Sequence, residues 1–204
     1  MEARYGGIIL RKKSHIALAG FIAENTPVSE LQAHRKAFAL GNILPDCKPS
    51  FVTTKHEFNG TFEMIQEKLR MLTVDCDLRH RNARVYWRRA GEVIHYIADY
   101  FTFPHNETFE GSLKEHCDYE QELKLKLREH IRSGEAKIHA ERVLRVHSVS
   151  ELIDYIRERH AEYLAKKRCV ADDIAFILSV CYQVVSGMVQ LLMGRESVLE
   201  AVII

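Results

Sequence analysis

Two pairs of residues spaced four apart could place metal ligands on the faces of helices. His95 and Asp99 form the first pair, and His116 and Glu120 form the second. Residues four apart in a helix lie one turn apart on the same face. Each pair therefore offers an imidazole nitrogen and a carboxylate oxygen to one ion, and zinc accepts both kinds of ligand.

His105 adds a fifth potential ligand between these pairs. It directly follows Pro104, a residue that ends or kinks a helix, so its side chain can turn back toward the same site. In a chain with 11 histidines and 28 acidic residues, one His–acid pair arises easily by chance and has an ordinary role in a surface or core hydrogen bond. Five such residues between positions 95 and 120 form a more specific pattern.

The five residues also match a known family signature. The run His-Tyr-Ile-Ala-Asp at 95–99, followed by Pro104-His105 and later by His116-x-x-x-Glu120, resembles that of zinc-dependent phospholipase C and the related S1-P1 nucleases. The four- and six-residue steps between the first three ligands are kept. An alanine stands before the aspartate where the family usually has glycine, and the proline directly precedes the histidine. Neither change removes a ligand.

Upstream residues resemble the first half of the same signature. The segment Gly-Asn-Ile-Leu-Pro-Asp, which ends at Asp46, resembles the family's turn with a Pro-Asp step, and His56 resembles the histidine that follows it. His15 resembles the family's early histidine ligand. Taken alone, Asp46 fits a helix-stopping turn equally well, and His15 fits an ordinary helix start. The resemblance covers about residues 14–123.

The resemblance implies eight ligands for two or three zinc ions. One ion would be bound by Asp46, His56, His95 and Asp99. A second would be bound by His105, His116 and Glu120. A third would share Asp99 and use His15; the N-terminal tryptophan that completes this site in the family is absent, and His34 is a conceivable substitute. Imidazole ligands in this number suit zinc better than magnesium. The histidines without ligand-like spacing are expected at the surface: His80, His130, His139, His147 and His160.

The implied function is that of a phosphodiester hydrolase in which zinc activates a water molecule. Asp46 is the candidate catalytic base. A phospholipid is one substrate of this class, but Cys47 stands where the phospholipases have an aromatic residue, which leaves choline recognition open. Two alternatives also stay open: a 3′-nucleotidase or nuclease of the same fold, and a zinc-binding protein without catalytic activity. The net charge of +1 counts against a stable complex with long nucleic acid.

Helices must position these residues, because helical periodicity dominates the chain and strand-like alternation is scarce. We predict an all-α protein with a single multi-helix domain over residues 1–204 and the metal cluster in a cleft between helices. An ordered loop at 41–54, stiffened by Pro45 and Pro49, would carry Asp46. The expected helices cover about residues 14–24, 29–40, 60–72, 83–103, 112–133, 150–166 and 169–192.

The chain offers few signs of a membrane or secreted protein. The uncharged stretch from Ile174 to Met193 is about long enough to span a bilayer, but polar residues interrupt it. We expect a buried central helix rather than a transmembrane segment. The five cysteines include no CxxC pair, which indicates free thiols in a reducing compartment. Because Ile8–Leu10 is too short for a signal peptide, we expect a cytoplasmic protein with at most transient contact with a membrane surface.

Overall fold

The computed structural model describes residues 2–47, 56–136, 143–166 and 169–202, with side chains from residue 13 to residue 195. These residues form helices and loops without a strand, which confirms the all-α prediction. The α-helices are α1 (Glu2–Asn25), α2 (Ser29–Ala33), α3 (Arg35–Gly41), α4 (Phe58–Thr73), α5 (Ala83–Tyr100), α6 (Leu113–Arg132), α7 (Val149–Ala165) and α8 (Val170–Val202). Two short 3-10 helices lie in the loops: η1 (Pro45–Cys47) and η3 (Phe103–His105).

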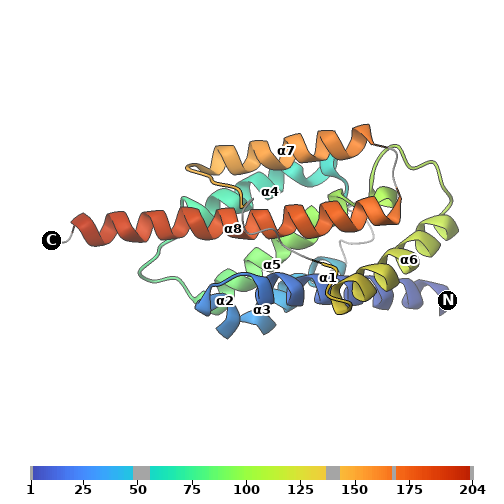
Figure 1. Cartoon of the computed structure of the whole chain (residues 1–204), viewed down its shortest axis with the longest axis horizontal. Helices are drawn as coiled ribbons and strands as arrows, with labels where there is room; N and C mark the ends of the chain where they lie inside the picture. The colour runs from blue at the N-terminus through green and yellow to red at the C-terminus, as the bar shows by residue number, and fades with distance from the viewer. Residues whose placement is uncertain (1, 48–55, 137–142, 167–168, 203–204) are drawn as a thin grey trace.

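The longest helix, α8, is the centre of the bundle. It runs along most of the molecule, with α4 and α7 on one side and α1 and α6 on the other (Figure 1). It packs against five helices: α1, α4, α5, α6 and α7. The buried side chains of Ile177, Val180, Val184 and Met188 are spaced three or four apart and form one of its apolar stripes. The core of the domain therefore surrounds this helix.

The apolar character of α8 also meets the criteria for a membrane span. By length and composition alone, the segment Val170–Arg195 could cross a membrane, with a mean hydropathy of 1.8. In the structure, 67% of its most apolar window is buried inside the molecule. A core helix has the same composition as a span, and burial of this extent favours the predicted central helix of a bundle.

Several helix boundaries differ from the predicted ones. α1 starts at Glu2 rather than near residue 14, and α8 continues to Val202 rather than ending near residue 192. The single helix predicted over 29–40 is instead two helices that meet at His34, whose φ of −109° and ψ of 18° are not helical. The break allows the short α3 to lie along α5, against which its buried face packs.

Two glycines bring α3 and α5 into direct backbone contact. A Cβ atom added at Gly91 would lie 2.2 Å from the carbonyl oxygen of Phe38, and one added at Gly41 would lie 1.9 Å from that of Arg88. Glycine alone permits so close an approach, because it has no Cβ. The contact places the carbonyl group of Asn42, the residue after α3, beside the buried face of α5.

The end of α5 is set by the residues that follow it. α5 ends at Tyr100, and Pro104 lies in η3. Proline has no N–H to donate to the carbonyl four residues back, and it disfavours helical backbone in the residue before it. Asn106 Nδ2 instead donates to the carbonyl oxygens of Tyr100 at 3.3 Å and Thr102 at 2.9 Å. His105 therefore lies outside the helix, as its position after proline predicted.

Candidate metal centre

α5 carries two of the candidate ligands on its buried face. His95 and Asp99 lie one turn apart, and both are buried. The Nδ1–H of His95 donates to the carbonyl oxygen of Asn42 at 2.8 Å. This hydrogen bond directs the other ring nitrogen, Nε2, toward Asp99, whose Oδ2 lies 3.3 Å away. The end of α3 therefore orients a candidate ligand of α5, as backbone carbonyls commonly do for zinc-binding histidines.

His56 forms a compact set of ligand atoms with these two residues. Its Nδ1 lies 3.0 Å from Asp99 Oδ2 and 3.2 Å from His95 Nε2. Ligand atoms of a tetrahedral zinc ion lie about 2.0–2.1 Å from the metal and therefore about 3.3 Å from one another. The three atoms have the separations of zinc ligands. Two imidazole nitrogens at this distance also require a proton or a cation between them.

Asp46 lies where it could provide a fourth ligand to this set. η1 places its buried side chain with Oδ1 3.6 Å from His95 Nε2 and 4.0 Å from His56 Nδ1. The other oxygen, Oδ2, is buried without a hydrogen-bond partner. A buried carboxylate oxygen without a partner is costly, so this atom fits a role in holding an ion or a water molecule.

A second set of ligand atoms lies between η3 and α6. The Nε2 atoms of His105 and His116 lie 3.0 Å and 2.9 Å from the same oxygen of Glu120, Oε1. α6 begins with a capping box formed by Ser112 and Glu115, which starts the helix one turn before His116. Three protein ligands are typical of catalytic zinc sites, where water or substrate takes the fourth position.

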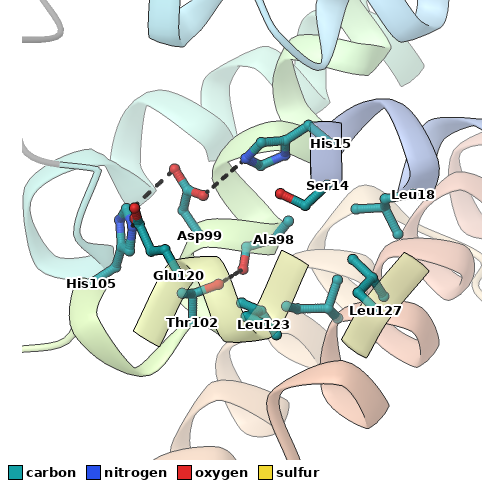
Figure 2. A pocket seen from close by; sticks show the side chains of 11 residues that line it. Ser14, His15, Leu18, Ala98, Asp99, Thr102, His105, Glu120, Leu123 and Leu127 are labelled. Carbon is teal, nitrogen blue, oxygen red and sulfur yellow. Dashed lines mark hydrogen bonds and ion pairs between the residues drawn. The ribbon is translucent and has the colours of Figure 1, made fainter. Parts of the chain in front are cut away.

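Asp99 connects both sets to His15 (Figure 2). Its Oδ1 lies 3.4 Å from His15 Nε2, and its Oδ2 lies 3.9 Å from His105 Nδ1. The His15 ring also stacks on that of His95, with ring centroids 4.1 Å apart. The candidate ligand atoms of His15, His95 and Asp46 lie within 4.8 Å of one another. α1 therefore contributes to the same centre as α5.

Comparison with known families shows what kind of protein holds this centre. The family model described as zinc dependent phospholipase C matches residues 14–170, more than three quarters of the chain. The chain belongs to the zinc-dependent phospholipase C family. No curated protein and no solved structure matches it. The matched residues include all eight candidate ligands, and membership supports the prediction of a zinc-dependent, phospholipase C-like hydrolase.

In this member of the zinc-dependent phospholipase C family, histidines surround the buried Asp99. Burial by itself raises the pKa of Asp99. The charges of His95 and His105 and the hydrogen bonds of His15 and His56 outweigh it, so the pKa is lowered well below its usual value. Burial likewise lowers the pKa of His95, but the carboxylate of Asp99 raises it above its usual value. The site therefore keeps Asp99 ionised, the form in which a carboxylate binds zinc.

The structure brings all eight predicted ligands together in three groups, of which the first two share His95: His15, Asp46 and His95; His56, His95 and Asp99; His105, His116 and Glu120. The ligand separations and the buried atoms without hydrogen-bond partners, Asp46 Oδ2 and His15 Nδ1, fit the zinc ions of the phospholipase C family. Zinc binding by these residues, and a third ion beside His15, stay predictions. His34 lies apart from these groups, at the junction of α2 and α3.

One histidine of this phospholipase C family member is wrongly predicted. His160 was expected at the surface, but it is buried. Its ring stacks on Phe58 with centroids 4.0 Å apart, and its Nε2–H donates to Asn106 Oδ1 at 3.0 Å. The spacing of Ile156, His160 and Tyr163 on the buried face of α7 could have revealed it. Because Asn106 follows a candidate ligand directly, His160 braces the loop that carries the second set.

The other histidines expected at the surface agree with the prediction where the structure describes them. His80 and His147 are exposed, and His130 is partly exposed. His139 lies outside the described residues. In the candidate zinc centre of this phospholipase C family member, by contrast, six of the eight ligands are buried, and His116 and Glu120 are partly buried.

Proposed function

We propose that this chain hydrolyses phosphodiesters as a phospholipase C-like enzyme, with two or three zinc ions held by the eight candidate ligands. The observation that best supports this function is the position of Asp99, whose oxygens face His15 and His105 on opposite sides. A carboxylate placed between ligand sets holds metal ions close together, and paired ions suit the phosphoryl group of a phosphodiester.

When bound, zinc polarises a phosphoryl oxygen and lowers the pKa of a coordinated water to about 7. We assign the uptake of a proton at the same site to Asp46. Its Oδ1 faces the imidazole nitrogens of His56 and His95, whereas its Oδ2 is buried without a partner. The two oxygens can therefore serve separately, one toward an ion and one as the general base.

Two cavities beside the centre share His105 as a lining residue. The smaller one, of about 30 Å³, also contacts Asp99 and Glu120 and has room for one or two water molecules. The larger one, of about 280 Å³, is lined by side chains that can hydrogen-bond an ester substituent: Asn59, Asn106, Arg157 and His160. We assign one substituent of the substrate to the larger cavity.

A substrate panel with and without a chelator tests the proposed function. The panel contains phosphatidylcholine, bis-p-nitrophenyl phosphate, a 3′-nucleotide and single-stranded nucleic acid, and elemental analysis measures zinc in the same samples. We expect two or three zinc ions per chain, hydrolysis of bis-p-nitrophenyl phosphate and a phospholipid, and loss of both activities with chelator. Asp99→Asn should reduce hydrolysis to background, because it removes the carboxylate charge shared by the ligand sets.

The control variant is Asp77→Asn, which changes an exposed aspartate that pairs with His80 at 3.0 Å. It should retain wild-type activity and zinc content. Fewer than one zinc ion per chain would contradict the metal centre. Turnover of the nucleotide or nucleic acid alone would indicate the nuclease of the same fold, and zinc without any turnover would indicate a protein that only binds the metal.

A further inference from the structure

Asp173 is a buried carboxylate outside both sets of candidate ligands. It lies in the first turns of α8, three residues beyond the segment that the family model matches, and its side chain is 0% exposed. A buried carboxylate requires hydrogen bonds, so its partners indicate what it holds in place.

Three donors from three different elements converge on Asp173. The backbone N–H of Phe103 in η3 and the hydroxyl of Tyr119 in α6 each donate to Oδ2 at 2.9 Å. The hydroxyl of Tyr163 in α7 donates to Oδ1 at 2.7 Å. The N-terminal end of α8 adds the positive end of its helix dipole. One side chain thus joins η3, α6 and α7 to α8.

Two of these donors adjoin candidate ligands of the second set. Phe103 lies two residues before His105 in the same short helix, and Tyr119 directly precedes Glu120. Holding the Phe103 backbone fixes η3 against α8. Holding the Tyr119 hydroxyl fixes the rotation of α6, and with it the direction of the next side chain, about 100° further round the helix.

We propose that Asp173 is a positioning residue that sets the places of His105 and Glu120 and so determines how tightly the second zinc ion binds. This inference rests on the proposed function. The other flank of η3 is held separately, by the bonds of Asn106 to the carbonyl of Thr102 and to His160. Asp173 therefore acts on the Phe103 end of η3.

The environment of Asp173 argues against a role in stability alone. Burial raises its pKa to about 6, even though the bonds from Phe103, Tyr163 and Tyr119 lower it, and the neighbouring Asp172 adds to the rise. At neutral pH the fold thus holds a charge that its surroundings disfavour. A buried charge in unfavourable surroundings adds little to the stability of the fold. Its presence fits a residue that fixes the positions of its neighbours.

Stepwise zinc affinities of the full-length protein test this role. Competition with a chromophoric chelator measures the affinity for each ion in wild type and in Asp173→Asn. The control is Asp172→Asn, which removes a charge one residue earlier. We expect Asp173→Asn to leave unchanged the affinity for the first ion, which is held by the set that includes His56 and His95. It should weaken the affinity for the second by about tenfold, the lower end of the loss that follows removal of a direct hydrogen-bond partner of a zinc ligand.

A second variant keeps the test decisive if Asp173→Asn does not fold. Tyr119→Phe removes one donor but keeps the ring, and it should weaken the same ion selectively. The positioning role would be overturned if Asp173→Asn lost affinity equally for both ions, or if it lost no more affinity than Asp172→Asn. If the wild type binds fewer than two zinc ions, the proposed function itself fails. If the wild type binds two and Asp173→Asn binds both with unchanged affinity, only the positioning role fails.

Discussion

At the scale of single residues, the chemistry of the centre depends on which atom each side chain presents. His95 shows this most clearly, because the carbonyl of Asn42 takes its Nδ1–H and leaves Nε2 toward Asp99. Asp46 likewise presents one oxygen to the histidines and keeps the other apart. These orientations fit the proposed division between ligand atoms and a general base within one cluster.

The raised pKa of Asp173 predicts a pH dependence of stability. Its pKa is about 6 in the folded protein against a usual value of 3.8. The folded state therefore binds the proton more tightly than the unfolded state. This contribution to stability is fully present below about pH 4 and is lost as the pH rises through about 6.

Denaturant unfolding of wild type and Asp173→Asn at several pH values, with chelator present, measures this effect. The unfolding free energy of wild type should fall relative to that of the variant between about pH 4 and 6, by on the order of 3 kcal/mol. Parallel curves over this pH range would show that burial does not raise the pKa of the Asp173 carboxyl group.

Sequence spacing predicts part of the residue-level picture and misses the rest. A separation of four within a helix was enough to place His95 with Asp99 and His116 with Glu120, because helix geometry is local. The hydrogen bonds of His160 to Asn106 and of Asp173 to Phe103 join residues 54 and 70 apart in the chain. No local rule specifies such partners, so these residues could be assigned only from the fold.

At the scale of helices, the contact between Gly91 and Phe38 predicts an unusual mutational result. In a helix interior, Gly→Ala normally stabilises a protein by roughly 0.5–1 kcal/mol. At Gly91 the new Cβ would lie 2.2 Å from the carbonyl oxygen of Phe38, so α3 and α5 must separate. We expect Gly91→Ala to destabilise the protein by about 1–3 kcal/mol, measured by denaturant unfolding.

Gly20→Ala in α1 is the matched control. A Cβ added at Gly20 meets nothing within 4 Å, so this change should be neutral or stabilising. Separation of α3 from α5 should also draw the carbonyl of Asn42 away from His95 and weaken zinc binding in the Gly91 variant alone. Equal stabilisation by both substitutions would show that the two backbones are not in contact.

Helix boundaries followed the sequence best where side chains cap the ends. Ser112 with Glu115, and Ser148 with Glu151, start α6 and α7 within one or two residues of the predicted positions. The break at His34 has no such signal in the sequence, since the side chain of His34 makes no capping hydrogen bond to the start of α3. It depends instead on packing against α5, which a single segment does not reveal.

At the scale of the whole molecule, metal removal should lower thermal stability. The candidate ligands come from α1, η1, α5, η3 and α6 and from His56 before α4, so bound zinc would join most of the bundle. Zinc present at about a hundred times its dissociation constant contributes about 2.7 kcal/mol. Chelation should therefore lower Tm by on the order of 5–10 °C in a domain of this size.

Circular dichroism melting before and after chelation provides the measurement. Added zinc should restore Tm, whereas magnesium should not, because the ligands are rich in imidazole. An unchanged Tm in a sample that elemental analysis shows to be free of zinc would mean that the metal does not support the fold.

The all-α architecture was predictable because helical periodicity runs through the whole chain. The meeting of Asp46 and His56 with His95 was not derivable from periodicity, since they lie 39 residues or more before His95. Their place in the centre was indicated by resemblance to a family signature. Spacing within a helix thus predicted the local ligand pairs, and the family resemblance supplied the long-range ones.

The central position of α8 has a consequence for how the protein is made. All eight candidate ligands precede this helix in the chain, so they leave the ribosome before the element around which the core packs. Until α8 follows, the apolar faces of α1, α4, α5, α6 and α7 lack their common partner. Zinc supplied during synthesis would meet its ligands before the bundle can close. The order of synthesis thus gives the metal an opportunity to organise the helices that α8 later covers.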